Sequence, residues 1–425
     1  MVKDGGFMNS EIYISEREAE IMSYLYQLRV LTIEQIYQKW WKGNSSNKPV
    51  GTLRTCRDSI RRFMSRTNYI TMFKPPLASA LCYVQLTPQG VKALRYFPIS
   101  FIGTRKRPFL RSDIIPLSRL TLHPRLFSHQ TALNQFVLDF EELDLPVSWT
   151  YYDEKFVSKI LPGVRPDGIL HVENTYYFLE MDMDTERDRA LKTKWEHYRS
   201  FLNSPTFYRM AGEIRVLFIT ECYSPQARAN HVRTLAFDSL FDKFNGRFDM
   251  FFGAPDEMSS IIKQYIYENE LMELSTIPYV SSLEQHGFVA KIRNDYGDMF
   301  ADLSFAIYIK SLHNEFFVCD FRNMSSSVIH DIFDWAGTTL RIKQATNKRI
   351  PYLLVCESLE HSFYTLKNVG VDLDVDNIFF TTTDRLKMLQ FHKALARIDS
   401  IGNVYEFTDE TLSDSVYRDN IKTYS

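Results

Sequence analysis

The segment TLRTCRDSIRRFMSR, residues 52–66, says most about how this chain folds. Its apolar residues recur at intervals of three and four, the spacing that places side chains on one face of a helix. This face consists of Leu53, Cys56, Ile60 and Phe63, whereas Arg54, Arg57, Arg61 and Arg62 occupy the other surfaces. The segment therefore predicts a helix with one buried face and a strongly basic exposed surface.

The sequence around this segment predicts a small domain of helices and strands. Residues 15–29 and 32–40 each begin with a capping box and have helical apolar spacing. Two strand-like runs, TNYITMF and ALCYVQLT, follow the third helix and are separated by KPPLAS, which suits a hairpin tip. Three helices followed by a hairpin predict a winged helix-turn-helix over residues 12–98.

Charge is distributed very unevenly along the chain. The formal net charge is -2, yet residues 39–125 contain seventeen Lys and Arg against only Asp58 and Asp113. The rest of the chain is correspondingly acidic. A basic module on an acidic body is typical of proteins that bind polyanions. The alternative is a solvated basic face that has no partner.

Duplex DNA is the polyanion that this arrangement predicts. A helix fits the major groove, where arginine binds phosphates and guanine edges, and a wing lysine reaches the backbone. A winged helix that mediates protein contacts is the alternative. The predicted DNA-binding residues are Arg54, Arg57, Arg61, Arg62, Arg66, Lys74, Arg105, Lys106 and Arg107.

The middle of the chain has the pattern of an α/β domain. Residues 99–146 are predicted to form a basic linker and a bridging helix, and residues 147–254 an α/β domain. Within this domain VSWTYYDEKFVSKI, RPDGILHV, TYYFLEMDMD and EIRVLFIT have strand character, and residues 186–201 have helical spacing.

Four carboxylates in this domain predict a metal site. Glu180, Asp182 and Asp184 share one face if TYYFLEMDMD is a strand, because strand side chains alternate. Crowded carboxylates repel one another unless a cation neutralises them, and oxygen ligands suit Mg²⁺ or Mn²⁺. With Asp167 from the preceding strand, they are expected to hold a metal that activates water against a phosphodiester.

The helix after these carboxylates supplies candidate partners and also an alternative explanation. Lys192 and Lys194 are placed to steady a phosphate or orient the water. However, acidic residues at the start of a helix also interact favourably with its dipole. This structural explanation suits Asp184 better than Asp167 or Glu180, which lie inside or beside strongly apolar strands.

The order RPDG, LEMD and a lysine-bearing helix resembles the PD-(D/E)XK nuclease-like superfamily. The resemblance implies that Asp167 and Glu180 are metal-binding carboxylates. Where the superfamily has a lysine, two residues after the glutamate, this chain has Asp182. Catalysis would then require Lys192 or Lys194 to substitute; a degenerate domain used for binding and an unrelated α/β domain are the alternatives.

A more particular resemblance extends from about residue 15 to residue 220. The chain resembles the replication-relaxation family of plasmids and mobile elements in the order of five features. These are a winged helix, a helix opening with His129, the segment Pro166-Asp167-Gly168, the strand LEMDMDTE and a helix with Lys194 and Tyr198. This resemblance implies DNA binding in plasmid replication or mobilisation.

Residues 255–425 are predicted to form a second α/β domain that includes one helix over SSVIHDIFDWAGTTLRIKQA and resembles a degenerate repeat of the first domain. In this comparison Asp302 corresponds to Asp167 and Asp320 to Glu180, and Arg322 follows where a catalytic lysine would stand. Such a pair would make a poor metal site. We expect this domain to support a homodimer or a protein partner through Trp335, Phe316 and Phe317 if these are exposed.

Other features limit the chemistry and location of the protein. The five cysteines form no C-x-x-C pair, so the sequence indicates neither disulfides nor zinc, and it contains no nucleotide-binding motif. No apolar run is long enough to span a bilayer and the N-terminus lacks a signal peptide, so we expect a cytoplasmic protein without a membrane partner.

The leading hypothesis is a DNA-binding protein of a plasmid or other mobile element, acting in replication, mobilisation or its control. Its winged helix would place a nuclease-like body on duplex DNA. An active metal-dependent endonuclease and a winged-helix transcription regulator are the two alternatives.

Overall fold

The computed structural model contains two compact units, residues 1–183 and residues 184–425. It describes residues 7–9, 12–42, 51–74, 81–96, 102–103, 120, 122–143, 145, 147–155, 157, 161, 163–244, 247–266, 277–292, 307–312, 314–322, 325–348, 350–371, 373 and 377–407. Both helices and mixed sheets are present, so the chain is a multidomain α/β protein, as the sequence indicated.

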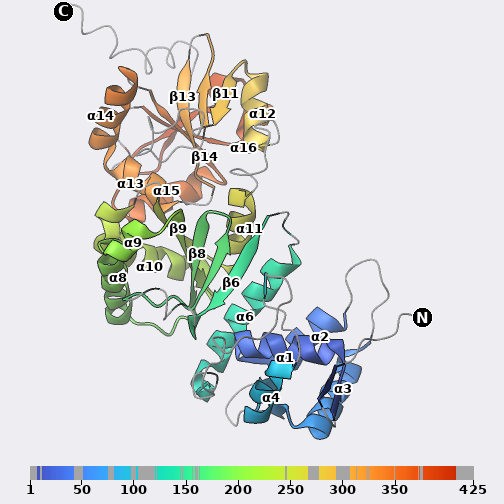
Figure 1. Cartoon of the computed structure of the whole chain (residues 1–425). Helices are drawn as coiled ribbons and strands as arrows, with labels where there is room; N and C mark the ends of the chain where they lie inside the picture. The colour runs from blue at the N-terminus through green and yellow to red at the C-terminus, as the bar shows by residue number, and fades with distance from the viewer. Residues whose placement is uncertain are drawn as a thin grey trace, which may run out of the picture. The chain divides into compact units, whose positions relative to one another are not determined.

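The first unit begins with a small module of helices around a three-stranded sheet (Figure 1). Its antiparallel strands lie in the order β3-β5-β4. The predicted capping boxes at Ser15 and Thr32 are confirmed, and Thr52 makes a third. The elements are β1 (Phe7–Asn9), β2 (Ile12–Ile14), α1 (Glu16–Leu28), β3 (Val30–Thr32), α2 (Ile33–Trp40), α3 (Leu53–Thr67), β4 (Ile70–Phe73), β5 (Tyr83–Leu86), α4 (Pro88–Ala93) and η1 (Leu94–Tyr96).

Helix α3 is amphipathic in the way that its sequence predicts. Cys56, Ile60 and Phe63 are buried, and the helix packs against α2 and β4. Each large apolar side chain buried in this way contributes roughly 1.5–3 kcal/mol. The helix ends at Asn68, whose left-handed backbone has φ of 54°.

A long helix, α6 (Phe127–Glu142), follows a short turn, η3 (Pro124–Leu126), and packs against β3. After it come the antiparallel strands β6 (Trp149–Asp153), β7 (Gly168–Val172) and β8 (Thr175–Asp182). The predicted strand over VSWTYYDEKFVSKI is therefore too long. It stops at Asp153 because the Asp153 carboxylate accepts the Lys155 backbone N–H at 2.8 Å and turns the chain.

The first part of the second unit alternates helices and parallel strands. Strand β9 is almost entirely buried, as its continuous apolar sequence predicts, and pairs with β10. The elements are α8 (Asp188–Leu202), α9 (Pro205–Arg209), β9 (Glu213–Thr220), α10 (Pro225–Leu240), η4 (Phe241–Lys243), β10 (Phe248–Gly253) and α11 (Pro255–Ile266).

The rest of this unit is built on a seven-stranded mixed sheet in the order β11 to β17. One face packs against α12, α16 and α17. The other face carries Tyr352, whose side chain contacts α13 and α14. Figure 1 shows α12 and α14 on opposite sides of this sheet. The elements are α12 (Pro278–Gln285), β11 (Val289–Ile292), β12 (Ile307–Lys310), β13 (Glu315–Asp320), α13 (Ser326–Phe333), α14 (Trp335–Thr346), β14 (Tyr352–Cys356), α15 (Leu359–Asn368), β15 (Ile378–Thr382), α16 (Thr383–Met388), α17 (Phe391–Ala394), β16 (Ala396–Ile398) and β17 (Val404–Glu406).

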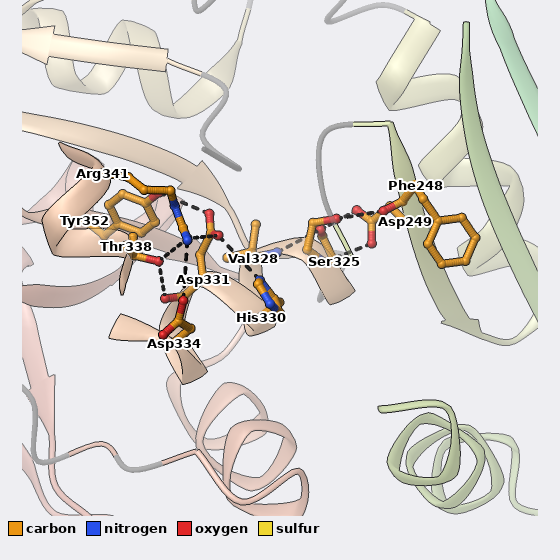
Figure 2. Close-up of polar contacts among 11 residues, drawn as sticks. Phe248, Asp249, Ser325, Val328, His330, Asp331, Asp334, Thr338, Arg341 and Tyr352 are labelled. Atoms are coloured by element: carbon orange, nitrogen blue, oxygen red, sulfur yellow. Dashed lines mark hydrogen bonds and ion pairs between the residues drawn. The ribbon is translucent and has the colours of Figure 1, made fainter. Parts of the chain in front are cut away.

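Helices α13 and α14 correct one sequence expectation. A single helix was predicted over SSVIHDIFDWAGTTLRIKQA, but it breaks at Asp334, which has a non-helical ψ of 47°. Arg341 binds both Asp331 and Asp334, at 3.2 and 3.4 Å, and so holds the two helices around the break (Figure 2).

The start of α13 is bonded to strand β10 of the same unit (Figure 2). The buried Asp249 carboxylate accepts the Ser325 hydroxyl at 2.5 Å and the Ser327 backbone N–H at 3.0 Å. The Ser326 hydroxyl donates to the Met250 carbonyl at 2.9 Å. These buried bonds satisfy donors at a helix N-terminus that would otherwise be unpaired.

Candidate functional site

The basic surface of α3 is the first candidate site. Arg54, Arg61 and Arg62 are exposed and Arg57 is half-buried. Arg61 lies 3.8 Å from Asp58, and Arg62 donates to the Ser59 hydroxyl at 3.3 Å, so both contacts stay within the exposed helix. Weak exposed contacts of this kind leave guanidinium groups available to another anion.

The charges of three cations of this module act on one thiol, Cys82. Burial raises the pKa of Cys82, while the positive charges of Arg57, Lys74 and Arg61 act on the same thiol in the opposite direction. Arg57 and Arg61 come from α3, whereas the exposed Lys74 follows the end of β4. Coulomb interactions weaken with distance, so cations that act on the same thiol belong to the same region of the module. Helix α3 and the end of β4 thus both contribute positive charge to the region around Cys82.

The other predicted DNA contacts have different surroundings. Arg66 donates to both carboxylate oxygens of Glu18, at 2.6 and 2.7 Å, and so connects α3 with α1. Its side chain is 45% exposed, which leaves part of the guanidinium accessible. Arg105, Lys106 and Arg107 lie outside the described residues.

Asp167 is the centre of the second candidate site. Register places it opposite Glu180, since Gly168 pairs with Leu179 and the Asp167 N–H donates to the Leu179 carbonyl. Its Oδ2 accepts the Met181 backbone N–H at 2.8 Å and lies 3.3 Å from His129 Nε2. Asp167 and His129 are each about a quarter to a third exposed, so solvent reaches this pair.

The packing of a neighbouring tyrosine explains why a glycine follows Asp167. A Cβ at Gly168 would lie 2.8 Å from Tyr151 Cε2 and 2.9 Å from its hydroxyl oxygen. The Tyr151 ring therefore lies directly against the Gly168 backbone, an approach that only glycine permits. Burial raises the pKa of Tyr151, and nearby Asp153 raises it further.

The remaining acidic residues separate into two groups. Glu180 and Asp182 are both buried at the end of β8. Asp184, predicted on the same strand face, instead lies beyond the strand with φ of 58°. It pairs with Arg228 at 3.3 Å, so its shared face with Glu180 and Asp182 was a wrong expectation.

Lys192 and Lys194 belong to α8 in the second unit. Lys194 pairs with Glu186 at 3.1 Å, and its ammonium lies over the Phe218 ring. Lys192 is exposed. In this unit Asp188 also pairs with His231, at 2.9 Å. The acidic residues at the start of α8 thus have local partners, as the structural explanation of this charge cluster expects.

A Mg²⁺ or Mn²⁺ ion requires several oxygen ligands around one point. Among the described residues, no three His, Cys, Asp or Glu side chains form a group that could hold a metal ion. One Asp167 oxygen is also engaged by His129 and the Met181 amide. Asp167 and Glu180 would therefore hold Mg²⁺ or Mn²⁺ only together with ligands from outside the protein, such as water or a DNA phosphate.

The C-terminal candidate residues have other partners. Arg322 binds both oxygens of Asp320 and lies over the Tyr279 ring. Asp302 lies outside the described residues. Phe316 and Phe317 are fully buried, and Trp335 is half-buried with its ring against Tyr352, so the two phenylalanines are core residues and not a docking surface.

Sequence reasoning missed Tyr151, Asp153 and Lys155. Lys155 lies 3.1 Å from Asp153, and both side chains are almost fully buried. Register places Asp153 opposite Gly168, one residue from Asp167. No local pattern reveals this cluster, because Lys155 also contacts backbone more than a hundred residues earlier.

One comparison with known proteins finds a match to part of this chain. Residues 22–217 match the model described as replication-relaxation. The matched range includes α3, His129, Asp167 and Glu180. No curated protein and no solved structure matches the chain. In the part of the chain that the structure describes, no helix combines the length and apolar character needed to cross a membrane.

Proposed function

We propose that this chain, which belongs to the replication-relaxation family through residues 22–217, binds duplex DNA in the replication or mobilisation of a plasmid or other mobile element. The N-terminal module acts as a winged helix. Its order of three helices and an antiparallel hairpin supports this assignment, with α3 as the helix that enters the major groove.

The proposal is carried by the placement of Arg57 and Arg61 on α3 and of Lys74 directly after β4, since the charges of all three act on the same thiol, Cys82. A recognition helix and a wing contact neighbouring parts of one duplex, so cations from both elements are expected to contact phosphates of the same duplex. The exposed Arg54 and Arg62 extend the same helix surface.

Fluorescence anisotropy with a labelled duplex tests this proposal. We expect the triple variant Arg57→Ala/Arg61→Ala/Lys74→Ala of the full chain to bind about tenfold or more weakly, since it removes three positive charges that are proposed to contact phosphates. Lys343→Ala removes an exposed lysine of α14 and is the matched control. Binding by the triple variant that equals the control would contradict the proposed interface.

The body of the protein is proposed to be nuclease-like and duplicated. In chain order, both β6–β10 and β11–β15 consist of an antiparallel meander followed by two parallel-type strands separated by helices. This shared order supports a degenerate repeat in residues 255–425. In this proposed repeat, Asp320 corresponds to Glu180, and its negative charge is paired with Arg322.

An endonuclease is the second candidate, favoured by the position of Asp167 opposite Glu180. Incubation of the full chain with supercoiled plasmid and Mn²⁺ separates it from a purely binding protein. Nicking that disappears in Glu180→Ala but persists in Asp184→Ala would establish it. Asp184 is a matched control because it is an exposed carboxylate with its own partner, Arg228. Nicking that is absent, or unchanged in Glu180→Ala, would remove this candidate.

A further inference from the structure

The C-terminal end of α1 is stabilised by side chains from distant parts of the first unit. The last turn of α1 contains no basic residue, and the chain leaves it through Arg29 with φ of 66°. Carbonyl groups at the end of a helix have no partner within the helix and require other donors. The donors here come from the region between residues 134 and 155.

Lys155 is the principal donor. Its ammonium donates to the carbonyls of Tyr26 at 2.9 Å and Gln27 at 3.2 Å, and it lies 3.1 Å from the Asp153 carboxylate. Its side chain is only 1% exposed. An ammonium group has three N–H donors, and these three oxygens accept one each.

Helix α6 supplies a second set of buried bonds to the same module. The fully buried Asn134 donates to the carbonyls of Leu28 and Val30, at 3.1 and 2.5 Å. Gln35 of α2 donates in turn to the Thr131 carbonyl at 2.8 Å. A polar group buried in this way is costly to leave unpaired, so these bonds favour one arrangement of the module on α6.

Asp153, the acidic partner of Lys155, connects this contact with the candidate site at Asp167. Asp153 is the last residue of β6 and pairs in register with Gly168, which follows Asp167. Tyr151, two residues earlier on β6, lies across Gly168. A short series of contacts thus connects the end of α1 with the strands that carry Asp167.

We propose that Lys155 is a positioning residue: by bonding both the end of α1 and Asp153, it holds the DNA-binding module in one fixed geometry relative to Asp167 and His129. The functional meaning rests on the proposed function, because a fixed geometry would set where the carboxylate site lies along bound DNA. All the residues concerned belong to the first compact unit.

Burial explains why the Lys155 contact acts as a lock, meaning that it holds the DNA-binding module in one geometry. Desolvation lowers the pKa of Lys155, and Asp153 opposes that effect. If Lys155 loses its charge or its place, Asp153 is left buried with an unpaired charge and two α1 carbonyls lose a donor. An arrangement in which the module moves away and water enters then becomes favourable.

Distance measurement by double electron–electron resonance tests the lock without DNA. Spin labels are attached at Ser65→Cys on α3 and at Arg165→Cys near Asp167, in full-length protein carrying Cys222→Ser. Ser65 and Arg165 are exposed, and Cys222 is the one cysteine among the described residues that is not buried. The labelled background is compared with Lys155→Met, with Lys155→Met/Asp153→Asn, and with the exposed-lysine control Lys343→Met.

We expect one narrow distance distribution in the background and in the control. Lys155→Met should give a distribution broader by about twofold and the double variant a smaller broadening, because there only the α1 carbonyls lose their donor; both should have an unchanged helical circular dichroism spectrum. The double variant removes the unpaired buried charge, so it remains informative if Lys155→Met does not fold. Equal widths in the double variant and the background, or a broad distribution in the background itself, would overturn the proposal. Because no DNA is present, failure here is distinguishable from failure to bind DNA.

Discussion

Oδ2 of Asp167 lies 3.3 Å from Nε2 of His129 and accepts the backbone N–H of Met181 at 2.8 Å. One carboxylate oxygen thus joins the start of α6 to the end of β8. Asp167 consequently has a structural role even without any chemistry.

This arrangement predicts a stability effect of Asp167→Ala. The substitution removes the acceptor of the Met181 N–H, and we expect a loss of about 1–3 kcal/mol in the free energy of unfolding. Asp167→Asn keeps an acceptor oxygen and should lose less. Chemical denaturation of both variants measures the difference, and equal losses would contradict the assigned role of the Met181 bond.

The Tyr151–Gly168 contact predicts a pair of opposite effects. Gly168→Ala should destabilise the protein by about 1–3 kcal/mol, because its new methyl group would overlap the Tyr151 ring. Tyr151→Phe should be neutral or stabilising, because among the described residues the buried Tyr151 hydroxyl has no hydrogen-bond partner. A thermal shift assay compares the two, and a strongly destabilised Tyr151→Phe would show that the hydroxyl has a partner after all.

Asp249 predicts a pH dependence of stability. Burial raises the pKa of Asp249 above its usual 3.8, although Arg215, which is its register partner on β9, and the bonds from Ser325, Ser327 and Met250 oppose this shift. The folded state then binds a proton more tightly than the unfolded state. The contribution of Asp249 to stability is therefore greatest at pH values below its ordinary pKa, and it is lost as pH rises through the raised pKa.

Asp249→Asn provides the measurement for this prediction. Asparagine retains an acceptor for the Ser327 N–H but has no charge to bury. We expect the stability of the wild-type chain relative to Asp249→Asn to decrease as pH rises from about 4 to about 7. A relative stability that increases over this range would mean that the folded state lowers this pKa instead.

Local signals made much of the fold predictable. The capping boxes at Ser15 and Thr32 and the apolar spacing of Cys56, Ile60 and Phe63 each depend on residues close in sequence, and all are confirmed. The match of residues 22–217 to the replication-relaxation model was also predictable, because the order of several short motifs persists even where each motif is weak.

Long-range contacts explain what the sequence could not reveal. Lys155 binds carbonyls of α1, which are separated from it by most of the N-terminal module. Asp184 leaves its expected strand face because its backbone is left-handed and Arg228 of α10 pairs with it. The helix break at Asp334 likewise depends on Arg341, seven residues later, binding back to Asp331 and Asp334. None of these partners is set by helix or strand periodicity.

The salt dependence of duplex binding tests the central claim most directly. Phosphate contacts release counterions, so affinity should fall by about a hundredfold to a thousandfold between 50 and 200 mM salt if about four to six such contacts form. The slope should decrease by about one unit for each of Arg57, Arg61 and Lys74 that is replaced and contacts a phosphate. An affinity that hardly changes with salt, or an unaltered slope in the triple variant, would contradict DNA binding by this surface.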